Sequence, residues 1–323
     1  MPRFQDSPFV LTAAGTETFL AFIQRFPLRD MSAFEVFDDP DALAELETQC
    51  LTPILDAAAR RGFDLLLDAL TWRAQPDWMQ ALGYGPGDVE RVNVQAVAGT
   101  RQFAARWAAS RDSADPISVF VGGDIGPRQD GYRVETIMSV EDARDYHVRQ
   151  IEALAGAGAD AIAAFTMTNA NEAAGIAVAA RDVDLPCIIS PTIETDGKTP
   201  DGLQLGEFVE AVEAATEGSP LFYMVNCAHP IHLEPVLQEA RARGADWIRR
   251  FGGFRANASS KTHAELDACT ELDRGHPEAL SAQLAHLQAD FSLRLLGGCC
   301  GTDAEHIEQL ADALSGAAHN ITA

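Results

Sequence analysis

A short apolar run followed by an amphipathic, alanine-rich stretch recurs about eight times along this chain of 323 residues. Each apolar run is short enough for a buried strand, and the stretches between the runs have helical periodicity. Such alternation is typical of a parallel sheet covered by helices. The apolar runs are FVLTAAG (9–15), DLLLDAL (64–70), ISVFVGGDIG (117–126), DAIAAFTM (160–167), PCIISPTI (186–193), LFYMVNC (221–227), WIRRFGGF (247–254) and SLRLLGG (292–298).

Eight strand–helix units predict a single (β/α)8 TIM barrel, of the α/β class, over residues 1–323. A doubly wound open sheet is the alternative fold. The segment AAGTETFL after the first run weakens it, because this segment lacks the G-x-G-x-x-G fingerprint of dinucleotide-binding sheets. In a barrel, the side chains that carry chemistry gather at the carboxyl ends of the strands.

The charge of the chain limits its partners. A net charge of −24 and a pI near 4.5 argue against nucleic acid and anionic membranes, which would be repelled. No apolar run approaches the roughly 20 residues that span a bilayer, and MPRFQDSPFV lacks the features of a signal peptide. Six cysteines in so long a chain are no disulfide scaffold. We therefore expect a cytoplasmic enzyme with reduced thiols.

Three cysteines lie at strand ends on the same predicted rim. Cys227 ends the sixth apolar run, and Cys299 and Cys300 follow the eighth. Three thiolates with an open fourth position are typical of a catalytic zinc site. Nearby glycines allow a sharp turn there, and Thr302 or Asp303 is placed to cap the next helix. His229 is a possible additional ligand.

Zinc bound to three thiolates is suited to holding a fourth thiolate. A free thiol has a pKa near 8.5, and coordination to a metal deprotonates it. A shift to below 7 amounts to about 2 kcal/mol of differential stabilisation. The expected reaction is attack by the bound sulfur on an electrophilic carbon.

The motifs VNCAHP and GGCCGTDAEHI resemble the two zinc motifs of the homocysteine S-methyltransferase family, which includes betaine– and S-methylmethionine–homocysteine methyltransferases. LTAAGTETFL resembles the opening strand of that family, and the resemblance extends from about Phe9 to Leu314. It implies a (β/α)8 barrel, a Zn2+ ion held by Cys227, Cys299 and Cys300, and methyl transfer to a thiol. Asn226 would then shape the site.

The sequence departs from the family at two strand ends. Members usually carry Asp-Gly-Gly after the first strand, where this chain has Ala13, Ala14 and Gly15, and many carry Glu-Thr after the fourth, where it has Phe165 and Thr166. The two missing acids are expected to hold the amino end of homocysteine, and each such contact contributes about 1.5–3 kcal/mol. Homocysteine is therefore predicted to be a non-preferred acceptor.

Glu17 could replace one of the missing acids, or it could simply be an acidic residue in the first turn of a helix. The simplest donor is a small onium compound, namely S-methylmethionine, S-adenosylmethionine or betaine. Such cations bind aromatic faces, and Trp72 is placed for this role, although it could equally be a packing residue. Arg73 could bind a donor carboxylate. Asp124 is a weaker candidate for a substrate contact.

Arg128, in the same glycine-rich loop as Asp124, is weaker still. Two other functions remain open at this point. One is a hydrolase that uses Cys227 as nucleophile and His229 as base, which would leave Cys299 and Cys300 without a role. The other is a zinc-binding barrel whose activity is lost or changed. The oligomeric state cannot be predicted from these features.

Overall fold

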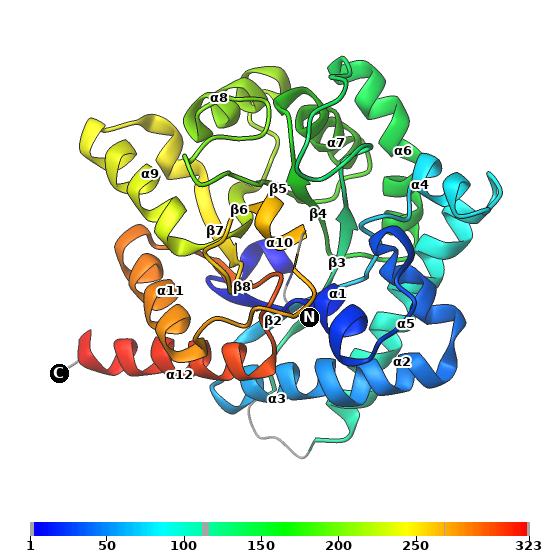
Figure 1. Cartoon of the computed structure of the whole chain (residues 1–323), viewed down its shortest axis with the longest axis horizontal. Helices are drawn as coiled ribbons and strands as arrows, with labels where there is room; N and C mark the ends of the chain where they lie inside the picture. The colour runs from blue at the N-terminus through cyan, green and yellow to red at the C-terminus, as the bar shows by residue number, and fades with distance from the viewer. Residues whose placement is uncertain (1–2, 112–115, 268, 322–323) are drawn as a thin grey trace.

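The computed structural model describes residues 3–111, 116–267 and 269–321. Eight parallel strands form a closed barrel in the order in which they occur along the chain, and helices surround it (Figure 1). The prediction of a (β/α)8 barrel is therefore confirmed. The strands are β1 (Val10–Thr12), β2 (Asp64–Asp68), β3 (Val119–Ile125), β4 (Ala161–Met167), β5 (Cys187–Pro191), β6 (Phe222–Ala228), β7 (Phe251–Ala256) and β8 (Leu295–Gly298).

Every strand is followed by at least one helix. The α-helices are α1 (Thr16–Thr18), α2 (Pro40–Leu46), α3 (Thr52–Arg60), α4 (Pro76–Ala81), α5 (Asp88–Ala109), α6 (Val140–Gly156), α7 (Ala170–Asp182), α8 (Leu205–Thr216), α9 (Pro230–Arg243), α10 (His263–Asp267), α11 (Pro277–Phe291) and α12 (Ala304–Ile321). Short 3-10 or π turns are η1 (Phe4–Asp6), η2 (Phe19–Ile23), η3 (Arg29–Met31), η4 (Ala33–Asp38), η5 (Glu47–Leu51) and η6 (Asp246–Arg250). The seventh apolar run is thus strand only from Phe251, because η6 occupies residues 247–250. No helix in the described ranges is long and apolar enough to cross a membrane.

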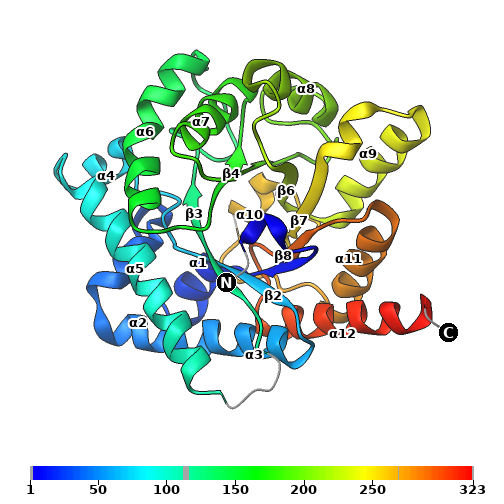
Figure 2. The same ribbon diagram turned by 180° about the vertical axis from the view of Figure 1, so that it is seen from behind.

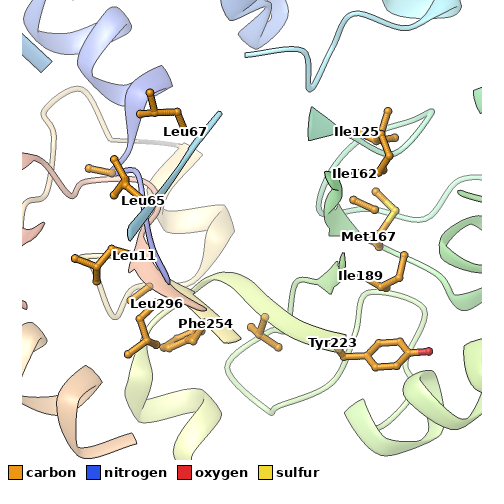
Figure 3. Close-up of a cluster of buried hydrophobic side chains, with 14 of the residues drawn as sticks. Leu11, Leu65, Leu67, Ile125, Ile162, Met167, Ile189, Tyr223, Phe254 and Leu296 are labelled. Carbon is orange, nitrogen blue, oxygen red and sulfur yellow. The ribbon is translucent and has the colours of Figure 1, made fainter. Parts of the chain in front are cut away.

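Alternate residues of the strands supply two separate cores. Leu65 and Leu67 of β2 belong to the layer between the barrel and its helices, whereas Leu66 belongs to the barrel interior. Every strand contributes to the outer layer, as the side chains around the strands in Figure 3 show. Buried parallel strands with helices outside need apolar residues on both faces. This explains why the apolar runs are continuous.

The interior core closes the amino-terminal end of the barrel. Phe4 of η1 packs edge-on against Phe120 of β3, with ring centroids 5.5 Å apart, and η1 lies across that end of the barrel in Figure 2. Phe222 and Leu295, the first residues of β6 and β8, belong to the same interior cluster. Since the barrel is filled at this end, a cavity has room only at the opposite, carboxyl-terminal rim.

Two β-bulges shape that rim. Thr166 is an extra residue between the β4–β5 pairs of Phe165 and Met167, and Cys227 is an extra residue between the β6–β7 pairs of Asn226 and Ala228. Both extra residues adopt left-handed backbone conformations, with φ of 60° and 58°. Bulges re-aim side chains and are frequent next to active sites. The bulge in β6 directs Cys227 toward the end of β8.

Candidate functional site

The three predicted cysteines meet at the carboxyl-terminal rim. The Cys227 Sγ atom lies 2.8 Å from the Sγ of Cys299 and 3.4 Å from that of Cys300. All three sulfurs lie within 4.8 Å of one another. The other cysteines lie elsewhere: Cys50 is in η5, Cys187 begins β5, and Cys269 follows α10. The convergence expected from strand position is therefore present.

Polar contacts fix the backbone and side chain of Cys227. The Nε2 atom of His263 lies 2.9 Å from the Cys227 carbonyl oxygen, and its Nδ1 atom lies 2.9 Å from a carboxylate oxygen of Glu194. Tyr132, in the loop after β3, donates a hydrogen bond from its hydroxyl group to Cys227 Sγ at 3.4 Å. The Tyr132 and His263 rings also stack, with centroids 4.1 Å apart. These contacts hold the bulge and the sulfur together.

The turn after β8 positions the other two sulfurs. The Cys299 backbone N–H donates to Ala256 of β7 at 2.8 Å, and Thr302 Oγ1 donates to the Cys299 carbonyl at 2.7 Å. A Cβ at Gly301, where φ is +80°, would lie 2.4 Å from a carbonyl oxygen of the α10–α11 connection. The glycine is thus required both by conformation and by space. Asp303 caps α12 by accepting from the backbone N–H of Glu305 at 3.1 Å.

The three thiols form an electrostatically coupled group. The hydrogen bonds with Cys299 and with Cys300 lower the pKa of Cys227, whereas the hydrogen bond with Cys227 raises the pKa of both Cys299 and Cys300. Zinc sites bind thiolate sulfur at about 2.3 Å and commonly combine three protein ligands with an open position. A compact set of three soft sulfur donors beside a cavity fits such a metal. His229 lies outside this set: its Nδ1 accepts from the Ile231 N–H at the start of α9.

A cavity of about 210 Å³ adjoins the sulfurs. The predicted residues that line it come from six strands or the loops that follow them: Glu17, Trp72, Arg73, Asp124, Phe165, Thr166, Asn226, Cys227, Cys299 and Cys300. Ala13 and Ala14 are buried but do not line it, and neither does Arg128, whose side chain pairs with Asp77.

Asn226 orients the residues around it. Its Oδ1 accepts from the Thr166 backbone N–H at 2.8 Å and from the Ser190 hydroxyl at 2.7 Å. Its Nδ2 donates to Thr166 Oγ1 at 3.0 Å. Asn226 therefore ties the bulge of β4 to the bulge of β6, one residue before the metal-binding candidate Cys227.

A buried ion pair that the sequence analysis missed crosses the cavity wall. Asp68, at the end of β2, accepts two hydrogen bonds from Arg255 of β7, at 2.9 and 2.7 Å. Both side chains are less than 10% exposed. The Arg255 guanidinium also lies 4.7 Å from the ring centroid of Phe165. Both Asp68 and Arg255 could have been proposed as site residues from the sequence, because each is a charged residue at the carboxyl end of a predicted strand.

Two acids in the cavity have raised pKa values. Burial, together with the negative charge of Asp68, raises the pKa of Glu17 to about 7. The same two causes raise the pKa of Asp124, whose Oδ2 accepts from the Leu70 N–H at 3.0 Å. The other oxygen of Asp124 is buried without a hydrogen-bond partner. Burial thus favours the neutral forms of both acids, which line the same cavity as the sulfurs.

The remaining cavity residues lie on the loops after β2 and β3. Trp72 donates its indole N–H to the Phe165 carbonyl at 3.2 Å, and one face of its ring is covered by the Arg73 guanidinium at 3.9 Å. Asp130 and Tyr132 also line the cavity, as does Met31 from η3. These last three were missed because loop residues carry no strand-end signal in the sequence.

Known proteins resemble this chain over most of its length. The homocysteine methyltransferase MmuM of Escherichia coli is 21% identical in its oxidized form and covers 95% of this chain and 96% of its own, with a TM-score of 0.71. Its metallated form gives 20% identity, the same coverage and a TM-score of 0.70. At these identities the likeness concerns the fold.

Curated relatives match over shorter segments. Homocysteine S-methyltransferase 3 of Arabidopsis thaliana is 25% identical over 180 residues, which are 55% of this chain and 50% of that enzyme. Methionine synthase of Mycobacterium leprae is 26% identical over 208 residues, which are 61% of this chain but 16% of that enzyme. The chain thus spans half or less of these relatives. A family model described as homocysteine S-methyltransferase matches residues 23–314, and the chain therefore belongs to the homocysteine S-methyltransferase family.

Proposed function

We propose that this protein is a zinc-dependent thiol S-methyltransferase, with Cys227, Cys299 and Cys300 as the metal ligands. The observation that carries the proposal is the cluster of three sulfurs within 4.8 Å at the mouth of the barrel, open to a cavity of about 210 Å³. Zinc bound there would supply a site at which an incoming thiol loses its proton. We also propose a cytoplasmic location, because the site needs three reduced thiols.

The residues of the chain position and shield this chemistry. The hydrogen bonds of Asn226 hold the β4 bulge against β6, and Tyr132 holds the Cys227 sulfur from the opposite loop. Burial around the sulfurs keeps bulk water away from the acceptor thiolate, which strengthens local electrostatic interactions. The methyl donor would be a small onium compound, namely S-methylmethionine, S-adenosylmethionine or betaine. Its cationic centre would approach the sulfur along the aromatic lining.

The acceptor is homocysteine or a related thiol, with homocysteine as a non-preferred substrate. Phe165 places a ring, not a carboxylate, in the cavity, and the nearest fixed charge is the Arg255–Asp68 pair. Asp68 is already paired with Arg255, so this pair offers no free carboxylate to the ammonium group of homocysteine. Glu17 is the available acid, with its raised pKa.

A thiol screen tests the function. Zinc-loaded protein is incubated with each of the three donors and a panel of thiols, and methylated products are detected by mass spectrometry. We expect product from at least one pair. Zinc binding without any methylated thiol would favour a zinc-binding barrel with lost or changed activity, and ester or amide hydrolysis that survives zinc removal would favour a cysteine hydrolase.

Steady-state kinetics over the same panel tests the acceptor. If homocysteine gives the highest kcat/KM, its assignment as non-preferred is wrong. A carboxylate introduced at position 165 would lie beside Arg255, which would pair with it. We therefore expect that homocysteine use rises only when the ion pair is also replaced, by Asp68→Asn with Arg255→Met, in addition to Phe165→Glu, because Arg255→Met alone would leave Asp68 buried without a partner. The single change Phe165→Glu is the matched control.

A further inference from the structure

Arg73 is a buried cation in the wall of the proposed active-site cavity. It follows β2, and only 5% of its surface is exposed. Its guanidinium lies between two indole rings, 3.9 Å from the centroid of Trp72 and 3.8 Å from that of Trp78. Stacking on both faces leaves only the edge of the guanidinium free to form hydrogen bonds.

Not all hydrogen-bond donors on that edge of Arg73 have a partner. Nη1 donates to the carbonyl oxygens of Pro127 at 3.3 Å and Gln129 at 2.8 Å, whereas Nε is buried without a partner. In the ranges that the structure describes, no carboxylate lies within ion-pair distance of Arg73. Burial lowers its pKa to about 10, so the group is still charged at neutral pH.

Arg255 is a second buried arginine in this cavity, and its charge is paired. It is equally buried, yet both of its terminal nitrogens are bonded to Asp68. Buried charges are as a rule paired, because an unpaired charge loses its hydration without compensation. The difference between the two arginines therefore points to a missing anion at Arg73.

We propose that Arg73 binds the carboxylate group of a substrate in this cavity. The planar fork of a guanidinium matches a carboxylate, and stacking between two rings holds that fork in place before the ligand arrives. Tyr132 also lines the cavity and reaches Cys227 Sγ at 3.4 Å. A carboxylate at Arg73 would thus be anchored in the same cavity as the sulfurs.

The role of this anchor in methyl transfer rests on the proposed function, but the binding itself does not. The carboxylate could belong to the onium donor or to the acceptor thiol, and two ligand pairs separate these sources. Betaine and betaine amide represent the donor. The thiols 3-mercaptopropionate and 3-mercaptopropionamide represent the acceptor. Within each pair, a carboxylate is replaced by a neutral amide of nearly the same size and shape.

Calorimetric titration gives the dissociation constants, with metal-free protein for the donor pair and zinc-loaded protein for the thiol pair. In one of the two ligand pairs, either the donor pair or the thiol pair, the carboxylate should bind at least about ten-fold more tightly than its amide, as expected for a charged hydrogen bond. Arg73→Gln should bring this ratio close to one without weakening the amide. Arg73→Lys should retain part of the ratio, since it keeps the charge but not the fork.

Arg128→Gln is the matched control, because Arg128 also stacks on a ring, at 4.5 Å from Tyr146, but lies outside the cavity. It should leave the ratio unchanged. A ratio near one in both arms of the native protein, or a ratio that survives Arg73→Gln, would overturn the proposal. A ratio that depends on Arg73 in a protein that methylates no thiol would refute the methyltransferase proposal and leave the carboxylate site standing.

Discussion

The sulfur edge of the cavity and its charged wall, formed by Asp68, Asp124 and Arg255, differ in how they are held. At the sulfur edge, backbone features dominate: a bulge at Cys227 and a glycine-rich turn at Cys299 and Cys300 aim three like side chains at one point. The charged wall is built from side chains of β2, β3 and β7, and within it Asp68 and Arg255 compensate each other's charge. The first arrangement is suited to one metal. The charged wall can be adapted to a different substrate by single substitutions.

Changes at the sulfur edge should have the largest effect. Cys227→Ser, Cys299→Ala and Cys300→Ala should each abolish stoichiometric zinc binding and methyl transfer, because a catalytic zinc site needs about three protein ligands. The fold should persist, since the barrel core lies below the rim. Zinc content by elemental analysis and circular dichroism check both statements. Cys269→Ser, a cysteine outside the cluster, is the control. Full zinc occupancy in any of the three variants would remove that cysteine from the ligand set.

The charged wall should respond through stability. Asp68→Asn leaves Arg255 buried without its partner, which costs about 3–5 kcal/mol in comparable buried pairs. Urea unfolding measures the loss. Asp77→Asn breaks an exposed pair with Arg128 and should cost less than about 1 kcal/mol. Equal losses in the two variants would show that the Asp68–Arg255 pair is not the element that holds this wall.

Tyr132 links the two regions, and its removal should have an intermediate effect. Tyr132→Phe deletes the hydrogen bond to Cys227 Sγ but keeps the ring that stacks on His263. Loss of such an outer contact to a metal ligand typically lowers metal affinity about 10-fold to 100-fold. Competition with a chelator gives the zinc affinity. Tyr84→Phe, whose hydroxyl bonds to Glu35 away from the cavity, should leave it unchanged.

The smallest expected effect is the pH dependence that Glu17 gives to stability. Its pKa is raised from 4.5 to about 7 by burial and by Asp68, so the folded chain holds this proton more tightly than the unfolded chain. The stabilisation is complete below pH 4.5 and is lost as pH rises through 7. Glu17→Gln should therefore gain stability over the native, metal-free protein steadily as the pH rises between these values. A constant difference across the range would place Glu17 in solvent.

Much of the barrel could be predicted because its strands are buried on both faces. Eight continuous apolar runs separated by helical stretches leave few other architectures, and each run overlaps an observed strand. The prediction was least accurate at the seventh run. Trp247 and Ile248 are apolar, but together with Arg249 and Arg250 they form the 3-10 turn that leads into β7.

The three sulfur positions could be predicted for a related reason. The carboxyl ends of all strands in a closed barrel lie on one rim, so cysteines after β6 and β8 are brought together by topology alone. The family match at residues 23–314 includes both motifs, but it begins after β1 and after Ala13 and Ala14, which follow β1. The departures predicted there therefore lie outside the matched region. The structure shows that these two alanines do not line the cavity.

The sequence by itself determined the architecture and the set of converging thiols, because both follow from local periodicity and strand order. Only the tertiary structure decided the charge of the cavity. Asp68 and Arg255 lie 187 residues apart and pair because β2 and β7 place them across one barrel. The proposed role of Arg73 also depends on the tertiary structure. Its burial between two tryptophans and its lack of a carboxylate partner result from the packing of distant loops. Side-chain pairing over such separations is fixed by packing, which local sequence does not encode.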